Sequence, residues 1–160
     1  MKTAVVYYSL DENCAFIAEC LGKCLDADVI RLLLKDEKKR KGFFKFFWGG
    51  TMVVFNKKPA LKPVNFDPAP YDLIIIGSPV WAGTFAPPIK TFLAETGITG
   101  KKLALYTCFA GNAGKSLINL KALLPGNVFL GEIGFKNPAS GNREEIQQQI
   151  NEWVLQMNSG

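Results

Sequence analysis

Apolar and polar positions along this chain follow a pattern that predicts five strands separated by helices. Short apolar runs predict strands over residues 2–8, 28–34, 71–77, 102–108 and 127–135. Apolar residues three and four positions apart predict helices over 14–25, 87–96, 112–124 and 142–157. Asn13 is placed to cap the first helix, and Gly77, Ser78 and Pro79 to end the third strand.

Regular alternation of strand and helix indicates one α/β domain over residues 1–160, with a five-stranded parallel sheet and helices on both faces. Candidate binding loops follow strands one, three and four, which favours the strand order 2-1-3-4-5. Residues 35–70 interrupt the alternation. There, an irregular basic and aromatic segment replaces the second crossover helix, and we expect a short helix followed by a loop.

The net charge of +5 is concentrated in that irregular segment, because residues 35–62 carry nine Lys/Arg against Asp36 and Glu37. We interpret the segment as a solvated basic rim or a docking site for an acidic redox protein. This interpretation is favoured over a nucleic-acid or membrane-surface patch. No apolar run approaches the ~20 residues of a membrane span, and no signal peptide is evident, so we expect a cytoplasmic protein.

The residue types that are missing restrict the chemistry. The chain has no histidine, which excludes His-based triads and His metal sites. Its four cysteines contain no C-x-x-C pair, which disfavours zinc and dithiol redox sites. Any chemistry must therefore use a cofactor, carboxylates, a thiol or the backbone, and we expect no metal site and no catalytic side chain.

Three loops at the carboxyl ends of the predicted strands carry the candidate site. The first has a helix start and neutral polar groups that suit a phosphate, the second offers an aromatic face between small residues, and the third repeats that composition. In order they are Ser9, Leu10, Asp11, Glu12, Asn13 and Cys14; Ser78, Pro79, Val80, Trp81, Ala82, Gly83 and Thr84; and Cys108, Phe109, Ala110, Gly111 and Asn112.

These motifs resemble those of flavodoxins and flavodoxin-like FMN proteins, over nearly the whole chain. Residues 77–84, followed by the proline pair, resemble the flavin-ring loop closely, whereas Ser9 and Asn13 match the phosphate loop and Asp11 and Glu12 depart from it. The resemblance implies a flavodoxin-like three-layer sandwich. It also implies FMN with its phosphate at 9–14, its ring at 78–84 and its pyrimidine side at 108–112. Trp81 would stack on the ring.

Three functions stay open at this point. The leading one is an FMN-dependent electron carrier, with Gly83 facing flavin N5 and Phe109 as a second wall of the ring pocket. An NAD(P)H-dependent FMN or quinone reductase on the same fold is the second, and a flavin-free binding module is the third.

Residues 111–116 resemble a Walker A loop, but Phe109 stands where that motif needs glycine, which disfavours an NTPase.

Overall fold

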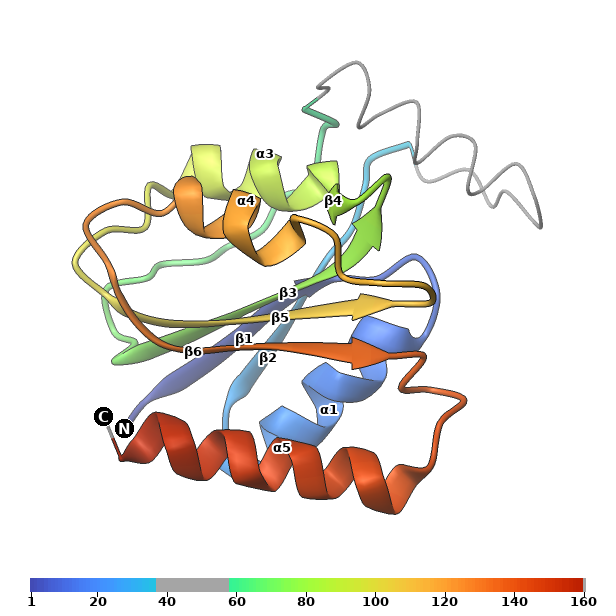
Figure 1. The fold of residues 1–160 in the computed structure, drawn as a ribbon. Helices are drawn as coiled ribbons and strands as arrows, with labels where there is room; N and C mark the ends of the chain where they lie inside the picture. The colour runs from blue at the N-terminus through green and yellow to red at the C-terminus, as the bar shows by residue number, and fades with distance from the viewer. Residues whose placement is uncertain (37–57, 160) are drawn as a thin grey trace.

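The central layer of the protein is a parallel sheet (Figure 1), seen in a computed structural model that describes residues 1–36 and 58–159. The five parallel strands run in the order β2-β1-β3-β5-β6, which confirms the predicted order 2-1-3-4-5. A short sixth strand, β4, pairs only with β3. The strands are β1 (Thr3–Tyr8), β2 (Asp28–Leu32), β3 (Leu73–Trp81), β4 (Thr84–Phe85), β5 (Lys102–Phe109) and β6 (Val128–Lys136).

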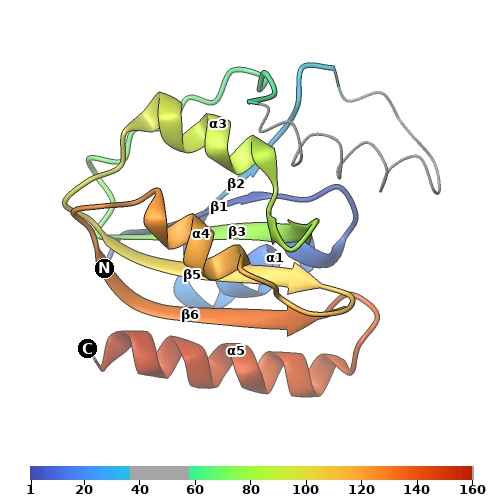
Figure 2. The same cartoon turned by 45° about the horizontal axis from the view of Figure 1, so that its top comes forward.

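Two pairs of helices form the outer layers (Figures 1 and 2). Helices α1 (Asn13–Leu25) and α5 (Arg143–Asn158) cover one face of the sheet, and α3 (Pro87–Thr96) and α4 (Ser116–Ala122) cover the other. Each face has its own apolar core because buried strands alternate their side chains between the two faces. The predicted three-layer sandwich is therefore confirmed.

Strand β3 is longer than the sequence pattern predicts. Gly77, Ser78 and Pro79 do not end it, since Gly77 pairs with Tyr106 and the next two residues pair with Thr107 and Cys108 in register. The pairing of β3 with β1 stops at Gly77. Proline is compatible with a strand where no neighbour needs its missing N–H, so β3 continues to Trp81 along β5 alone.

The chain then reverses in a two-residue hairpin that was not predicted. Ala82 and Gly83 have φ values of 47° and 76°, and Val80 pairs with Phe85 on either side of them. Positive φ at both central positions is typical of the tight turns that join antiparallel strands. As expected, Pro87 and Pro88 occupy the first turn of α3.

Helix α4 begins at Ser116 rather than near Asn112, as we expected from the sequence. Gly114 has a φ of 53°, and its N–H donates to the Asn112 side chain at 3.0 Å. The N–H of Lys115 donates to the Gly83 carbonyl at 2.8 Å instead of to a helical partner. The preceding turn therefore occupies residues 112–115 and delays the helix.

The irregular segment is held at its two described ends. Leu34 and Leu61 form an antiparallel bridge, and the Lys35 N–H donates to the Ala60 carbonyl at 3.0 Å. β2 itself ends at Leu32, two residues earlier than expected, because the chain passes from the parallel sheet into this pairing. The short helix expected within residues 35–70 lies outside the described residues.

No helix of 1–36 or 58–159 has the length and apolar content to cross a membrane.

Candidate functional site

The loops at the carboxyl edge of the sheet contact one another directly (Figure 2). The Gly83 carbonyl at the tip of the β3–β4 hairpin accepts the Lys115 N–H at 2.8 Å, and Asn119 Nδ2 donates to Thr84 Oγ1 at 2.9 Å. A Cβ on Gly114 would lie 2.4 Å from the Gly83 oxygen. The hairpin and the β5–α4 loop therefore form one structural unit beside the first loop.

The first loop is organised around the buried Ser9 hydroxyl at the end of β1. Ser9 Oγ donates to the Asp11 carbonyl and accepts the Ala15 N–H at 3.3 Å. Asp11 Oδ1 accepts the Asn13 N–H at 3.1 Å. The loop thus folds back onto the start of α1, and one of its helix-terminal donors is occupied by its own carboxylate.

Four other backbone N–H groups of this loop have no hydrogen-bond acceptor among the described residues, namely those of Leu10, Asp11, Glu12 and Cys14. Helix α1 starts after Glu12 without a side-chain cap. Cys14 is fully buried, so water does not compensate its N–H easily. Unpaired donors at a helix N-terminus form a site that suits an anion.

Asn13 does not cap α1, contrary to our expectation, because Glu12 takes the capping position and Asn13 is already helical. Its side-chain oxygen instead accepts the Ala139 N–H at 3.0 Å. The β6–α5 loop therefore joins the edge, and Asn137 also ties it to the Phe109 carbonyl at 2.9 Å. The sequence did not predict that this loop joins the site, because contacts between distant loops leave no periodic pattern of apolar residues. The turn-forming sequence Asn137–Asn142 is the only local indication of the loop.

Trp81 lies at the start of the hairpin with its ring edge-on to Tyr8, the last residue of β1. Their ring centroids are 5.5 Å apart and the planes meet at 87°. Tyr8 is fully buried and Trp81 is half-buried. The T-shaped contact orients the indole and leaves part of its surface at the edge of the sheet.

The remaining hairpin residues divide into structural and exposed positions. Ser78 is fully buried, and its Oγ accepts the Ala86 N–H at 2.8 Å, which positions the start of α3. Pro79 is also buried, whereas Val80 and Thr84 are half-buried. Ala82 and Gly83 are exposed, and nothing lies within 4 Å of a Cβ built on Gly83.

In the third loop, the Phe109 ring lies against Gly134 of β6, where a Cβ would come within 2.8 Å of it. This contact places the Phe109 ring over the edge strand β6. Ala110, Gly111 and Asn112 are exposed. The predicted third loop thus reaches the same edge, but its aromatic residue packs against β6.

Two buried thiols connect the first and third loops beneath the surface. Burial raises the pKa of the Cys14 thiol well above its ordinary value, and the adjacent Cys108 thiol raises it further. Both cysteines are free and belong to the same apolar core. Neither has the exposed, electropositive surroundings of a reactive cysteine, as the sequence led us to expect for Cys14.

Tyr106 fixes the start of α1 against the sheet. Its hydroxyl donates to the Cys14 carbonyl at 2.9 Å, and its ring crosses β3 at Gly77. A Cβ on Gly77 would lie 2.0 Å from the Tyr106 ring, so only glycine fits there. Burial raises the pKa of the Tyr106 hydroxyl well above its ordinary value, which keeps it a hydrogen-bond donor.

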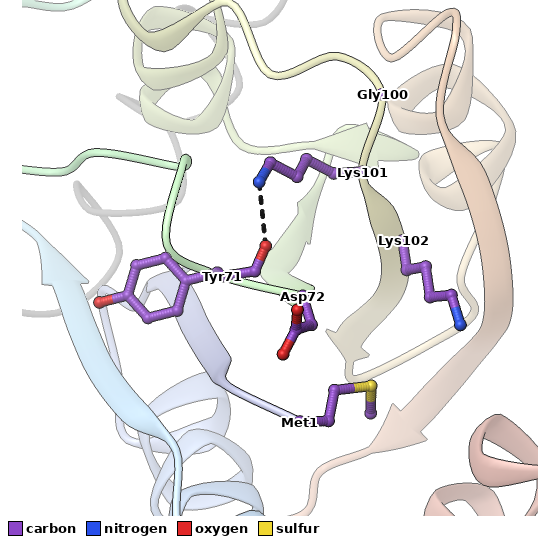
Figure 3. A pocket seen from close by; sticks show the side chains of 6 residues that line it. All are labelled: Met1, Tyr71, Asp72, Gly100, Lys101 and Lys102. Atoms are coloured by element: carbon purple, nitrogen blue, oxygen red, sulfur yellow. Dashed lines mark hydrogen bonds between the residues drawn. The ribbon is translucent and has the colours of Figure 1, made fainter.

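A cavity of about 430 Å³ lies at the opposite, amino edge of the strands (Figure 3). Two of its charged side chains already have partners: Lys101 Nζ donates to the Tyr71 and Ala69 carbonyls at 3.0 and 2.8 Å, and Asp72 accepts the Lys2 N–H at 2.7 Å. The unpaired backbone donors are at the carboxyl edge instead, where ligands of open α/β sheets bind.

Comparison with solved structures extends the likeness across the whole chain. A flavoprotein from Lactobacillus acidophilus, crystallised in complex with FMN, superposes with a TM-score of 0.74 at 24% identity, covering 96% of this chain and 98% of that one. A flavodoxin from the domain Archaea gives 0.58 at 17% identity, with 99% of both chains covered. A Streptococcus pneumoniae flavodoxin superposes with a TM-score of 0.59 at 13% identity, and the alignment again covers 99% of both chains.

The protein has the flavodoxin-like fold. No protein-family model matches the sequence, and no curated protein matches it either. At these identities, the likeness concerns the fold and not the individual site residues. In the flavodoxin-like fold, the switch point lies between β1 and β3, and the loops after those two strands are the β1–α1 loop and the Trp81 hairpin.

Proposed function

We propose that the protein binds FMN at the carboxyl edge of its sheet and acts as an electron-transfer protein. The buried N–H of Cys14, which has no acceptor among the described residues, is the observation that carries this proposal. Cys14 lies in the first turn of α1, directly after the β1–α1 loop. The fold shared with flavodoxins and with a flavoprotein crystallised with FMN supports the same ligand.

The first loop fits the phosphate of FMN through its backbone. The N–H groups of Leu10, Asp11, Glu12 and Cys14 supply the donors, and the positive end of α1 adds to the attraction. The Asp11 carboxylate opposes it, because it carries negative charge and already holds the Asn13 N–H. We therefore propose that the phosphate binds, with an affinity lowered by Asp11 and by the nearby Glu12.

The hairpin fits the flavin ring. Trp81, oriented by Tyr8, provides an aromatic face, and Gly83 lets a planar ligand approach the backbone without a side chain in the way. The Gly83 carbonyl accepts a hydrogen bond from the Lys115 N–H, and this bond fixes the direction of the carbonyl. Ala82 and Gly83 are exposed, so a ring bound here keeps one edge within reach of a partner protein.

Bound FMN would supply the reversible redox chemistry, and the chain needs no acid or base of its own for electron transfer. Its residues hold the phosphate, orient the ring and exclude water from one side. We propose an acidic redox protein as the partner, since residues 35–62 are strongly basic. Of these cations, the structure describes Lys35, Lys58 and Lys62, all exposed.

Titration of the purified protein with FMN, followed by flavin fluorescence and the visible spectrum, tests this proposal. We expect quenching and a perturbed absorption band, followed by slow or no bleaching when NADPH is added without oxygen. Rapid bleaching by NADPH would replace the electron carrier with a reductase. Absence of any flavin binding would refute both functions and favour the flavin-free module.

Replacement of Trp81 tests the ring site separately. Trp81→Ala should weaken FMN binding about tenfold, because aromatic stacking on a base contributes about 1–3 kcal/mol. Trp81→Phe keeps an aromatic face and serves as the matched control, with a much smaller loss expected. Equal affinities for wild type and Trp81→Ala would exclude Trp81 as the ring platform.

A further inference from the structure

One cation reaches the phosphate loop from a neighbouring strand. Arg31 is on β2, opposite Tyr7 in the parallel register, and its Nη2 donates to the Ser9 carbonyl at 3.0 Å. Ser9 ends β1 and opens the loop. Among the described residues, Arg31 is the only cationic side chain that hydrogen-bonds to residues 9–14.

Glu12 of the loop and this guanidinium both influence the Tyr7 hydroxyl. Burial raises the pKa of the Tyr7 hydroxyl, the positive charge of Arg31 opposes that rise, and the negative charges of Glu19 and Glu12 add to it. Arg31 and Glu12 therefore have opposite electrostatic effects on the pKa of the same hydroxyl. Asp11 precedes Glu12 in the sequence, and its carboxylate is turned back onto the Asn13 N–H.

The negative charges of this loop make a nearby cation favourable for phosphate binding. Asp11 and Glu12 contribute two negative charges, and the FMN phosphate would bring up to two more. Backbone donors and a helix terminus offer only partial positive charge. A guanidinium has five N–H donors in a planar fork, of which one is used on Ser9, so it retains donors for phosphate oxygens.

We propose that Arg31 is the specificity-determining cation of the phosphate site, which lets this acidic loop accept the phosphate of FMN and prefer FMN over riboflavin. This inference rests on the proposed FMN site. It assigns to β2, an edge strand, a role that no loop motif in the sequence indicates. A simpler role for Arg31, bracing the Ser9 carbonyl, would affect both flavins alike, because riboflavin differs from FMN only in lacking the phosphate.

Parallel titrations with FMN and riboflavin test the inference. Arg31→Gln should weaken FMN binding about tenfold or more and change riboflavin binding less than twofold. Arg31→Lys keeps the charge and should retain most of the FMN affinity. Lys102→Gln makes the same change in net charge at the opposite edge of the sheet (Figure 3) and should leave both affinities unchanged.

Salt dependence gives a second readout that a bracing role would not change. FMN binding to wild type should weaken between 50 and 500 mM NaCl, and that slope should be smaller in Arg31→Gln. Equal losses for both flavins in Arg31→Gln, or no loss at all, would overturn the inference while leaving the FMN site intact. Wild-type protein that binds neither flavin would instead refute the proposed function itself.

Discussion

Gly77→Ala is the most direct test of how the fold positions the first loop. The new methyl group would start 2.0 Å from the Tyr106 ring, which lies between β3 and the first turn of α1. Both Gly77 and Tyr106 are in the middle of the sheet, where β3 pairs with β1 and β5. The ring must therefore move, because the strands on either side cannot.

The expected cost follows from three contributions. Overpacking of a core costs about 1–3 kcal/mol, and loss of the hydrogen bond from the Tyr106 hydroxyl to Cys14 adds about 1 kcal/mol. Restriction of the unfolded chain by alanine offsets about 0.4–1 kcal/mol. We therefore expect the free energy of unfolding to fall by about 2–3 kcal/mol, a large part of the ~5–15 kcal/mol typical of a domain.

Urea unfolding followed by circular dichroism measures this change. With an m-value of about 2 kcal/mol/M, the midpoint should fall by about 1 M or more. Gly111→Ala is the matched control, since nothing lies within 4 Å of its added Cβ, and its midpoint should barely move. A Gly77→Ala midpoint equal to that of Gly111→Ala would refute the reasoning.

A double-mutant cycle isolates the contact itself. Tyr106→Leu removes the ring that the Gly77→Ala methyl group would meet, so the double variant should lose less stability than the sum of the two single variants. Additive losses would mean that the cost of Gly77→Ala arises elsewhere, for example in the strand backbone.

Three further predictions concern the first loop and the buried or exposed thiols. Asp11→Asn should tighten FMN binding a few-fold, measured by fluorescence titration, because it removes one negative charge and weakens the competing hydrogen bond to the loop. The free energy of unfolding should fall as the pH rises above about 9. Burial raises the pKa of Cys14 and Tyr106 in the folded protein, so the unfolded chain loses those protons at lower pH than the folded protein does. Thermal melts from pH 7 to 10.5 should show this decline, and Cys14→Ala should make it less steep. In native protein, a thiol reagent should modify the exposed Cys24 quickly, whereas rapid labelling of Cys14 or Cys108 would contradict their burial.

Most elements could be predicted from the sequence because burial on both faces leaves a strong local pattern. The run Leu73–Ile76 has no polar residue, and its four side chains are fully buried, alternating between the two cores. Helix α5 was equally clear, since its buried residues Ile146, Ile150, Trp153 and Met157 share one stripe.

The errors fall where the structure depends on contacts between distant loops. The hairpin after Trp81 is a strand pairing of two residues, too short for a periodic signal. The start of α4 is delayed because the Lys115 N–H bonds to Gly83, more than thirty residues earlier, and no window of local sequence contains both. Asn13 has the composition of a cap but bonds to Ala139 instead.

The candidate site shows the same division. Its loops could be located, because parallel strands bring their carboxyl ends to one edge. The roles of single side chains could not, since they depend on where neighbouring elements direct them. Ser78 turned out to support α3, and the Phe109 ring lies against Gly134. Arg31 was overlooked because its strand carries no loop motif.

The pairing that ties Leu34 to Leu61 brings the two ends of the intervening stretch together, and Thr91 Oγ1 of α3 holds one end by donating to the Pro59 carbonyl at 2.8 Å. Its two ends meet at one point on the sheet, so the domain does not need a particular length of chain between them. Exchange for a four-residue turn would lower the entropy cost of closing this loop by about 1.5 kcal/mol. Exchange of residues 37–57 should therefore leave the sheet and its carboxyl edge folded, which circular dichroism can check, and FMN titration of the exchanged variant would show whether the proposed flavin site depends on this segment.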